Sequence, residues 1–170
     1  MNLKTFITDI PDFPTKGVVF RDITPLLKDA DAISYTENAL LQLLGNAKVD
    51  KVVGMESRGF FFAPILAIRL NAGFVPVRKA GKLPGKTIKQ EYDLEYGTDA
   101  LEMHADAIQK GDKVLVHDDV LATGGTANAT CKLIEKMGGE IVQCNFLLEL
   151  DMLNGKNKLL DYELKSLLHY

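Results

Sequence analysis

The chain has 170 residues, 46% of them hydrophobic and 25% charged, and a formal net charge of −3 at pH 7. This length suits one domain with a substantial core, and the charge argues against a nucleic-acid-binding protein, which would carry a concentrated basic excess. From the apolar runs and the cysteine spacing we expect no membrane span, no secretory signal, and two reduced thiols, Cys131 and Cys144, in a cytoplasmic protein.

The N-terminal part contains one unusual segment, Phe13–Pro25, in which prolines and a glycine surround apolar residues. Before it, residues 1–13 are weakly patterned, and we expect a short helix there. Because the segment has no sustained hydrophobic period, it predicts an ordered loop over a core. Core packing with a surface ion pair explains it most simply. The alternative is that Phe20 packs on an aromatic base while Val19 and Arg21 contact its edge.

Alternating helices and strands follow. We expect a helix over residues 29–45, a strand over Lys51–Met55, a helix over Phe60–Leu70 and a strand over Phe74–Val77. Between the first strand and the next helix lies Glu56-Ser57-Arg58-Gly59. An arginine beside helix-start N–H groups suits an oxyanion such as pyrophosphate, although a capped helix with a solvated arginine explains these residues equally well.

The chain then becomes basic and rich in glycine and proline over Arg78–Thr87. A solvated loop is one explanation. The other is a mobile lid hinged at glycines, in which the lysines and the arginine of the segment gather pyrophosphate charge and exclude water on closing. The partial alternation of Ile88–Tyr96 fits the arms of a lid hairpin.

The strongest signal is the stretch Val114–Thr126, in which a β-branched run precedes two acids and a glycine turn. Consecutive N–H groups of Ala122–Thr126 can point into one concavity, because the two glycines permit the close approach that a phosphate needs. The helix that follows adds the partial positive charge of its N-terminus. Asp118 and Asp119 would repel a phosphate directly, so we expect them to accept hydrogen bonds from hydroxyl groups of the same ligand or to help hold a divalent cation. A sugar phosphate satisfies both requirements.

Three further features carry weaker predictions. His117 is expected to alternate away from Asp118, which favours a structural histidine over a general base. A strand over Leu101–Met103 is expected to pair near Ala105–Ile108. Residues 151–170 are expected to form a strand or a cover at the edge of the sheet.

The alternation of strands and helices, with polar turns at strand ends, predicts an α/β fold with a doubly wound, mostly parallel sheet. Val114–Thr126 also resembles the 5-phosphoribosyl-1-pyrophosphate (PRPP) signature of the type I phosphoribosyltransferases. Phe13–Pro25, Gly81–Gly85 and Leu94–Gly97 resemble the adenine-specific members of that family. The resemblance implies a single domain over residues 1–170, with an N-terminal hood mainly over residues 1–28 and a flexible lid hairpin over about residues 79–100.

The resemblance implies transfer of the phosphoribosyl group of PRPP to adenine, which gives AMP and pyrophosphate in purine salvage. It implies Mg²⁺ held largely by PRPP, with no protein side chain as a main ligand. The residues implied are Glu95 as the catalytic acid–base group; Asp118, Asp119, Ala122, Thr123, Gly124, Gly125 and Thr126 for PRPP; Ser57, Arg58, Arg78 and Lys82 for pyrophosphate; and Val19, Phe20 and Arg21 for adenine. The family usually has an aliphatic residue at the position of His117.

Two alternative functions remain open at this point. One is a phosphoribosyltransferase for another purine, since the sequence does not show the backbone acceptors that would select an amino group. The other is a non-catalytic PRPP sensor, such as a transcriptional regulator, although we find no spare helix-turn-helix or basic patch. The resemblance further implies a homodimer, in which Arg78 or Lys79 crosses to the partner's site, and predicts neither a nucleic-acid nor a membrane partner.

Overall fold

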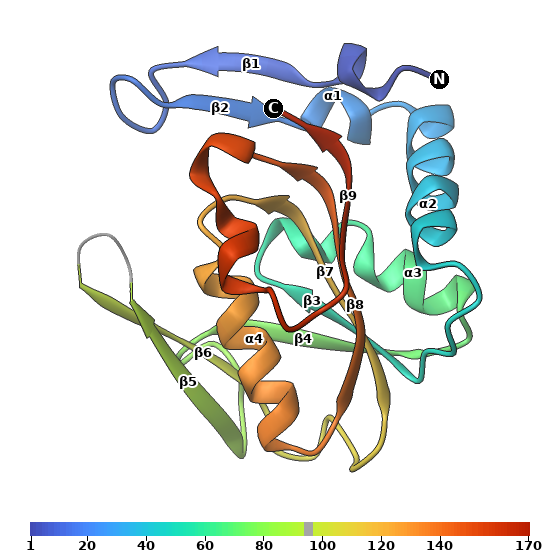
Figure 1. Cartoon of the computed structure of the whole chain (residues 1–170), viewed down its shortest axis with the longest axis vertical. Helices are drawn as coiled ribbons and strands as arrows, with labels where there is room; N and C mark the ends of the chain where they lie inside the picture. Colours follow the sequence, from blue (N-terminus) through green and yellow to red (C-terminus); the bar gives the residue numbers. More distant parts are fainter. Residues whose placement is uncertain (94–96) are drawn as a thin grey trace. The chain divides into compact units, whose positions relative to one another are not determined.

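The computed structural model describes residues 1–93 and 97–170, and it divides the chain into two compact units, Met1–Ala39 and Leu40–Tyr170 (Figure 1). We refer to them as the N-terminal unit and the C-terminal unit. None of the described helices is long and apolar enough to cross a membrane.

The N-terminal unit contains a two-stranded antiparallel sheet. Its elements are a 3₁₀ helix η1 (Leu3–Phe6), β1 (Thr8–Pro11), β2 (Val19–Asp22), α1 (Thr24–Leu27) and the start of α2 (Ala30–Leu44). The expected short helix is present only as η1, because the residues that follow pair as β1 with β2, from Thr8 opposite Asp22 to Pro11 opposite Val19. The Asp29 carboxylate accepts a hydrogen bond from the Ala32 N–H at 2.8 Å and so caps α2.

The C-terminal unit is built on a seven-stranded sheet in the order β5-β6-β4-β3-β7-β8-β9. The strands are β3 (Lys51–Met55), β4 (Gly73–Lys79), β5 (Thr87–Asp93), β6 (Thr98–His104), β7 (Lys113–Leu121), β8 (Glu140–Glu149) and β9 (Leu164–His169). β4, β3, β7, β8 and β9 run parallel, whereas β5 and β6 are antiparallel. The predicted α/β fold with a mostly parallel sheet is therefore confirmed, and β9 is the predicted edge strand.

Helices pack on the central strands from both faces. On one face, α4 (Gly125–Lys136) contributes Cys131, Leu133 and Ile134 to a core that also contains Val53 and Val116 of β3 and β7. On the other face, the residues just before and within α3 (Ala63–Arg69) reach β3 and β7, since the Phe62 ring lies 6.3 Å from that of His117. The helix expected over Phe60–Leu70 is split into a 3₁₀ turn η2 (Arg58–Phe60) and the shorter α3, which has proline in its first turn.

The central strand β7 is longer than its β-branched run indicates. It continues to Leu121 because β8 supplies backbone partners beyond Val116, pairing Phe146 with Asp118 and Leu148 with Val120. Asp118 and Asp119 therefore lie within a strand rather than after its end, where their backbone is fixed by the sheet.

The expected pairing of Leu101–Met103 with Ala105–Ile108 is wrong. Leu101–Met103 belongs to β6, which pairs along its length with β5 and, at its centre, with β4. Residues 105–108 form a turn instead, and Ile108 is buried in the core against α4. The long hairpin satisfies the backbone of β6, which leaves no role for a local partner.

Candidate active site

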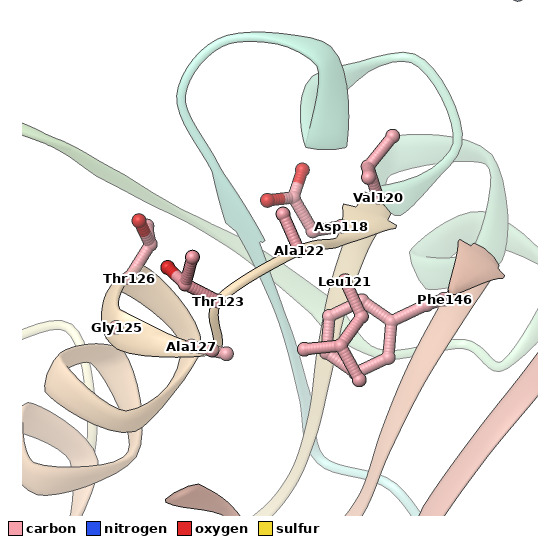
Figure 2. A pocket seen from close by; sticks show the side chains of 10 residues that line it. Asp118, Val120, Leu121, Ala122, Thr123, Gly125, Thr126, Ala127 and Phe146 are labelled. Atoms are coloured by element: carbon pink, nitrogen blue, oxygen red, sulfur yellow. The ribbon is translucent and has the colours of Figure 1, made fainter. Parts of the chain in front are cut away.

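A concave loop connects β7 to α4 at the carboxyl edge of the sheet. Ala122–Thr126 line a cavity of about 80 Å³, together with Asp118, Val120 and Phe146 (Figure 2). Figure 2 shows the hydroxyl groups of Thr123 and Thr126 projecting from this loop and from the first turn of α4. Backbone N–H groups, two hydroxyls and a helix N-terminus thus meet at one place, which is suited to a phosphate.

The loop packs closely against a second glycine, Gly155, for which the sequence predicts no role. Gly124 has a φ of +75°, and a Cβ atom there would lie 2.3 Å from the carbonyl oxygen of Gly155. A Cβ atom at Gly155, in the 3₁₀ turn η4 (Gly155–Lys158), would lie 2.1 Å from the carbonyl oxygen of Ala122. Two backbones therefore touch at this point. The only signal in the sequence is a glycine in a polar turn.

We expect Gly155→Ala to destabilise the protein by about 2 kcal/mol, because the added methyl group must force two backbone segments apart. Thermal denaturation should show a melting temperature lower by roughly 6 °C for a chain of this size. Gly73→Ala is the matched control, since a Cβ at Gly73 meets only the flexible Lys51 side chain. An unchanged melting temperature for Gly155→Ala would show that the loop relaxes without cost.

The two acids of β7 face an arginine from the neighbouring turn. The Arg58 Nε atom of η2 lies 2.9 Å from Asp119 Oδ2, and the Asp119 side chain is only 4% exposed. Gly59 lets the turn lie close to the other acid, because a Cβ atom there would lie 2.9 Å from Asp118 Oδ1. Burial, reinforced by the negative charge of Asp119, raises the pKa of Asp118 well above its usual value. Burial also raises the pKa of Asp119, against the opposing effect of Arg58.

A larger cavity of about 330 Å³ lies beside this pair and is lined by Glu56, Ser57, Arg58, Asp118, Asp119, Val120 and Ala122. It shares Asp118, Val120 and Ala122 with the phosphate-sized cavity. The structure therefore brings together Ser57, Arg58 and most of the residues predicted to bind PRPP. A ligand with a phosphate at one end and hydroxyl groups in the middle fits the two adjoining spaces.

Glu56 forms ion pairs with Arg78 and Lys82, the two remaining residues predicted to bind pyrophosphate. Its Oε1 atom lies 2.7 Å from Lys82 Nζ and 3.2 Å from Arg78 Nη2, and its Oε2 atom accepts a hydrogen bond from the Lys79 N–H at 3.0 Å. Burial alone would favour the neutral acid, but the hydrogen bonds from Lys82, Lys79 and Arg78 lower the pKa of Glu56 to about 2. Arg78 and Lys82 are thereby held at a residue that lines the larger cavity. Glu56 follows β3 directly in the sequence, but nothing in the local pattern predicts this role.

The residues predicted to bind a base lie in the N-terminal unit. The Phe20 ring packs edge-on against Phe13, with ring centroids 5.2 Å apart, while Arg21 forms an ion pair with Asp9 across the two-stranded sheet. Val19 is exposed. Their contact with a base stays a prediction, and Glu95 lies outside the described residues.

His117 is a structural residue, as expected. It is fully buried, and its Nδ1 atom lies 2.7 Å from Asn145 Oδ1 of β8. Burial outweighs the hydrogen bond with Asn145 and lowers the pKa of His117 to about 4. The ring is therefore neutral at pH 7 and lines neither of the two cavities.

This burial predicts a pH dependence of folding. Since the unfolded chain protonates His117 near pH 6.5 and the folded chain only near pH 4, the unfolded state binds the extra proton between these values. The free energy of unfolding should fall by about 2 kcal/mol more between pH 7 and pH 5 in the wild type than in His117→Leu. Urea denaturation at the two pH values measures this difference, and parallel losses in both proteins would contradict it.

Comparison with known proteins agrees with this geometry. Residues 21–165 match the model of the phosphoribosyl transferase domain. The chain is 63% identical over its full length to an adenine phosphoribosyltransferase from Christiangramia forsetii, 99% of which is covered. Its structure superposes with a TM-score of 0.97 on the adenine phosphoribosyltransferase of Thermoanaerobacter pseudethanolicus, at 50% identity and with 99% and 98% of the two chains covered. The Saccharomyces cerevisiae enzyme gives a TM-score of 0.91 at 40% identity, with 96% and 95% covered. With a glycine loop, an acidic pair and a cation cluster at one sheet edge, and with relatives this similar along its length, the chain belongs to the adenine phosphoribosyltransferase family.

Proposed function

We propose that this enzyme transfers the phosphoribosyl group of PRPP to adenine and forms AMP and pyrophosphate in purine salvage. The observation that carries the proposal is the pair of adjoining cavities that share Asp118, Val120 and Ala122. One is suited to the 5-phosphate, and the other has acids for the ribose and cations for the pyrophosphate. The yeast relative was solved as a complex with adenine and an imino-altritol bisphosphate, which supports the same ligand pair here.

In this proposal the acidic pair binds the ribose. Asp118 and Asp119 accept hydrogen bonds from the ribose hydroxyls, and their negative charge lies near the sugar as positive charge develops at the anomeric carbon. The N–H groups of Ala122–Thr126 hold the 5-phosphate, which fixes the distance between that end of PRPP and the reacting carbon. The two acids lie near the end of β7, and the loop begins directly after it. The sheet therefore holds the acids and the start of the loop in a fixed arrangement.

The leaving pyrophosphate is assigned to the turn after β3 and to the cations at Glu56. Ser57 and Arg58 line the larger cavity directly. Arg78 and Lys82 are presented through their shared contact with Glu56. These cations stabilise the negative charge that develops on the departing group, which is a main part of catalysis in this reaction.

Magnesium fits this site as a partner of the substrate. Glu56, Asp118 and Asp119 supply the carboxylate oxygens that Mg²⁺ prefers. Among the described residues, however, the acids of this cavity do not form a group of three that could hold a metal ion. We therefore propose that oxygens of PRPP hold most of the ion's coordination sphere, with no protein side chain as a main ligand, and that the ion neutralises pyrophosphate charge there.

For adenine we propose the residues that the family resemblance implies. Val19 and Arg21 position the base through their backbone groups, and Phe20 packs near it. Glu95 exchanges a proton with one ring nitrogen of adenine while another nitrogen attacks the anomeric carbon. The exposed Val19 and the half-buried Phe20 of β2 offer an accessible apolar surface for this purpose.

We also propose a homodimer in the cytoplasm. Cys131 and Cys144 are buried free thiols with their Sγ atoms 3.6 Å apart, as suits a reducing compartment. The proposed crossing of Arg78 or Lys79 competes with contacts in their own chain, to Glu56 and Asp99 respectively. Light scattering coupled to size exclusion measures the oligomeric state.

Product analysis tests the proposed function directly. The purified protein is incubated with adenine, PRPP and Mg²⁺, and the nucleotides are separated by chromatography. We expect AMP and pyrophosphate in equal amounts, and no AMP when PRPP or Mg²⁺ is omitted. PRPP binding measured by calorimetry in the absence of any AMP formation would instead support the sensor function.

A further inference from the structure

The carboxylate of Glu102 is buried in β6, where it contacts the basic segment Arg78–Thr87. Glu102 of β6 is 2% exposed. Its Oε1 atom accepts hydrogen bonds from the backbone N–H groups of Lys82 and Leu83, both at 2.9 Å. Its Oε2 atom accepts a hydrogen bond from the Thr87 hydroxyl at 3.3 Å and lies 4.0 Å from Lys89 Nζ.

These contacts keep Glu102 charged despite its burial. The hydrogen bond from the Leu83 N–H, with further ones from Gly81 and Lys82, lowers the pKa of Glu102 against the effect of burial. A buried charge of this kind is stable only while its donors stay in place. The carboxylate and the backbone of residues 81–83 therefore order one another.

Lys82 is the residue at the centre of this arrangement. Its N–H binds Glu102, its carbonyl oxygen accepts a hydrogen bond from Arg78 Nη1 at 3.1 Å, and its ammonium group lies 2.7 Å from Glu56 Oε1. The Lys82 side chain is nevertheless half exposed. Its direction is thus set by the backbone contacts and the ion pair with Glu56, rather than by packing of the side chain.

We propose that Glu102 is a positioning residue for pyrophosphate, which fixes the backbone of residues 82–83 so that the Lys82 ammonium group faces the leaving group. The inference rests on the proposed function. Without Glu102, binding must also order a segment rich in glycine and proline, and each ordered residue costs free energy. Glu102 touches neither of the two cavities, so it acts only through this segment.

Substitution of Glu102 should therefore act on PRPP and pyrophosphate and leave adenine unaffected. We expect Glu102→Gln to raise the KM for PRPP and the Kd for pyrophosphate about tenfold, with the KM for adenine unchanged and kcat within about twofold. Glu102→Asp keeps the charge but is one methylene shorter, and it should show a similar loss. Thr87→Val is the matched control, because it removes the hydrogen bond to Glu102 Oε2, whereas Lys82 and Leu83 bind Oε1. It should leave these constants unchanged.

A double-mutant cycle with Lys82→Ala tests whether Glu102 acts through Lys82. The Glu102→Gln effect on pyrophosphate binding should largely vanish in the Lys82→Ala background. Additive effects, or a Glu102→Asp protein that binds pyrophosphate like the wild type, would overturn the inference. Thermal denaturation identifies any variant that fails to fold, in which case the remaining variant carries the test. Failure of the wild type to make AMP would overturn the proposed function instead. Pyrophosphate binding does not depend on AMP formation, so it can be measured whether or not the wild type is active.

Discussion

Asp119→Asn is expected to lower kcat/KM for PRPP roughly 100-fold, the equivalent of about 3 kcal/mol of lost interaction. The Asp119 carboxylate is almost fully buried and lies 2.9 Å from Arg58 Nε. An amide in its place removes the charge that pairs with Arg58 and presents an NH₂ group where a ribose hydroxyl should donate. Steady-state kinetics with PRPP as the varied substrate measures the loss.

The same substitution at the other end of β7 provides the control. Asp112 lies just before the strand, and its carboxylate accepts a hydrogen bond from the Gln109 N–H at 2.8 Å. Asp112→Asn should leave the kinetics with PRPP within about twofold of the wild type, as is usual for substitutions away from a site. Comparable effects of the two variants would contradict the assignment of the acidic pair to the ribose.

Glu95→Gln is expected to reduce kcat about 100-fold while the KM for PRPP changes little. The reason is chemical: glutamine keeps the shape of the side chain but cannot exchange a proton with adenine, and general acid–base catalysis contributes at least this factor. Steady-state kinetics with both substrates varied separates the two constants. PRPP affinity measured by calorimetry should match that of the wild type.

Glu91→Gln is a suitable control, since Glu91 is an exposed acid of β5, four positions earlier in the sequence. It should leave kcat unchanged. Taken with Asp119→Asn, the Glu95 variant separates the two halves of the reaction, binding of PRPP and proton exchange with the base. Negligible effects of both Asp119→Asn and Glu95→Gln would contradict both assignments.

Local patterns in the sequence were enough to predict that the glycine loop and the two acids lie together between a strand and a helix. Val114–Thr126 contains a strand, two carboxylates, a glycine turn and a helix start in one continuous stretch, so chain order and spatial order coincide. The parallel sheet followed from the same alternation. The pattern misplaced the end of β7, because strand length depends on the partner that β8 offers rather than on β-branched residues alone.

Residues that act through distant partners gave no comparable signal. Gly155 is 31 positions from Gly124 in the chain, yet the two backbones meet. Glu56 and Glu102 are acids without a motif of their own, and only the fold shows that Glu56 binds two cations of the basic segment and Glu102 its backbone. Contacts of this kind depend on the sheet order β6-β4-β3, which no local periodicity encodes.

The basic segment Arg78–Thr87 also makes contacts that its own sequence does not predict. Composition offered a glycine-hinged lid in Arg78–Thr87 as one of two explanations, and the family resemblance implied a flexible lid hairpin over about residues 79–100. The structure shows that the part nearest to β4 is fastened by Glu56 and Glu102, while β5 and β6 form the arms of the hairpin. Hinges and lid motion stay predictions, because they concern exchange between conformations.

The measurement that tests the central claim most directly is the rate of pyrophosphate release with PRPP and Mg²⁺ when adenine, hypoxanthine, guanine and xanthine are compared as acceptors. We predict release with adenine alone, because the hood and lid segments resemble those of the adenine-specific enzymes. Release with an oxo-purine at a comparable rate would contradict the assignment of the base, although the PRPP site would stand.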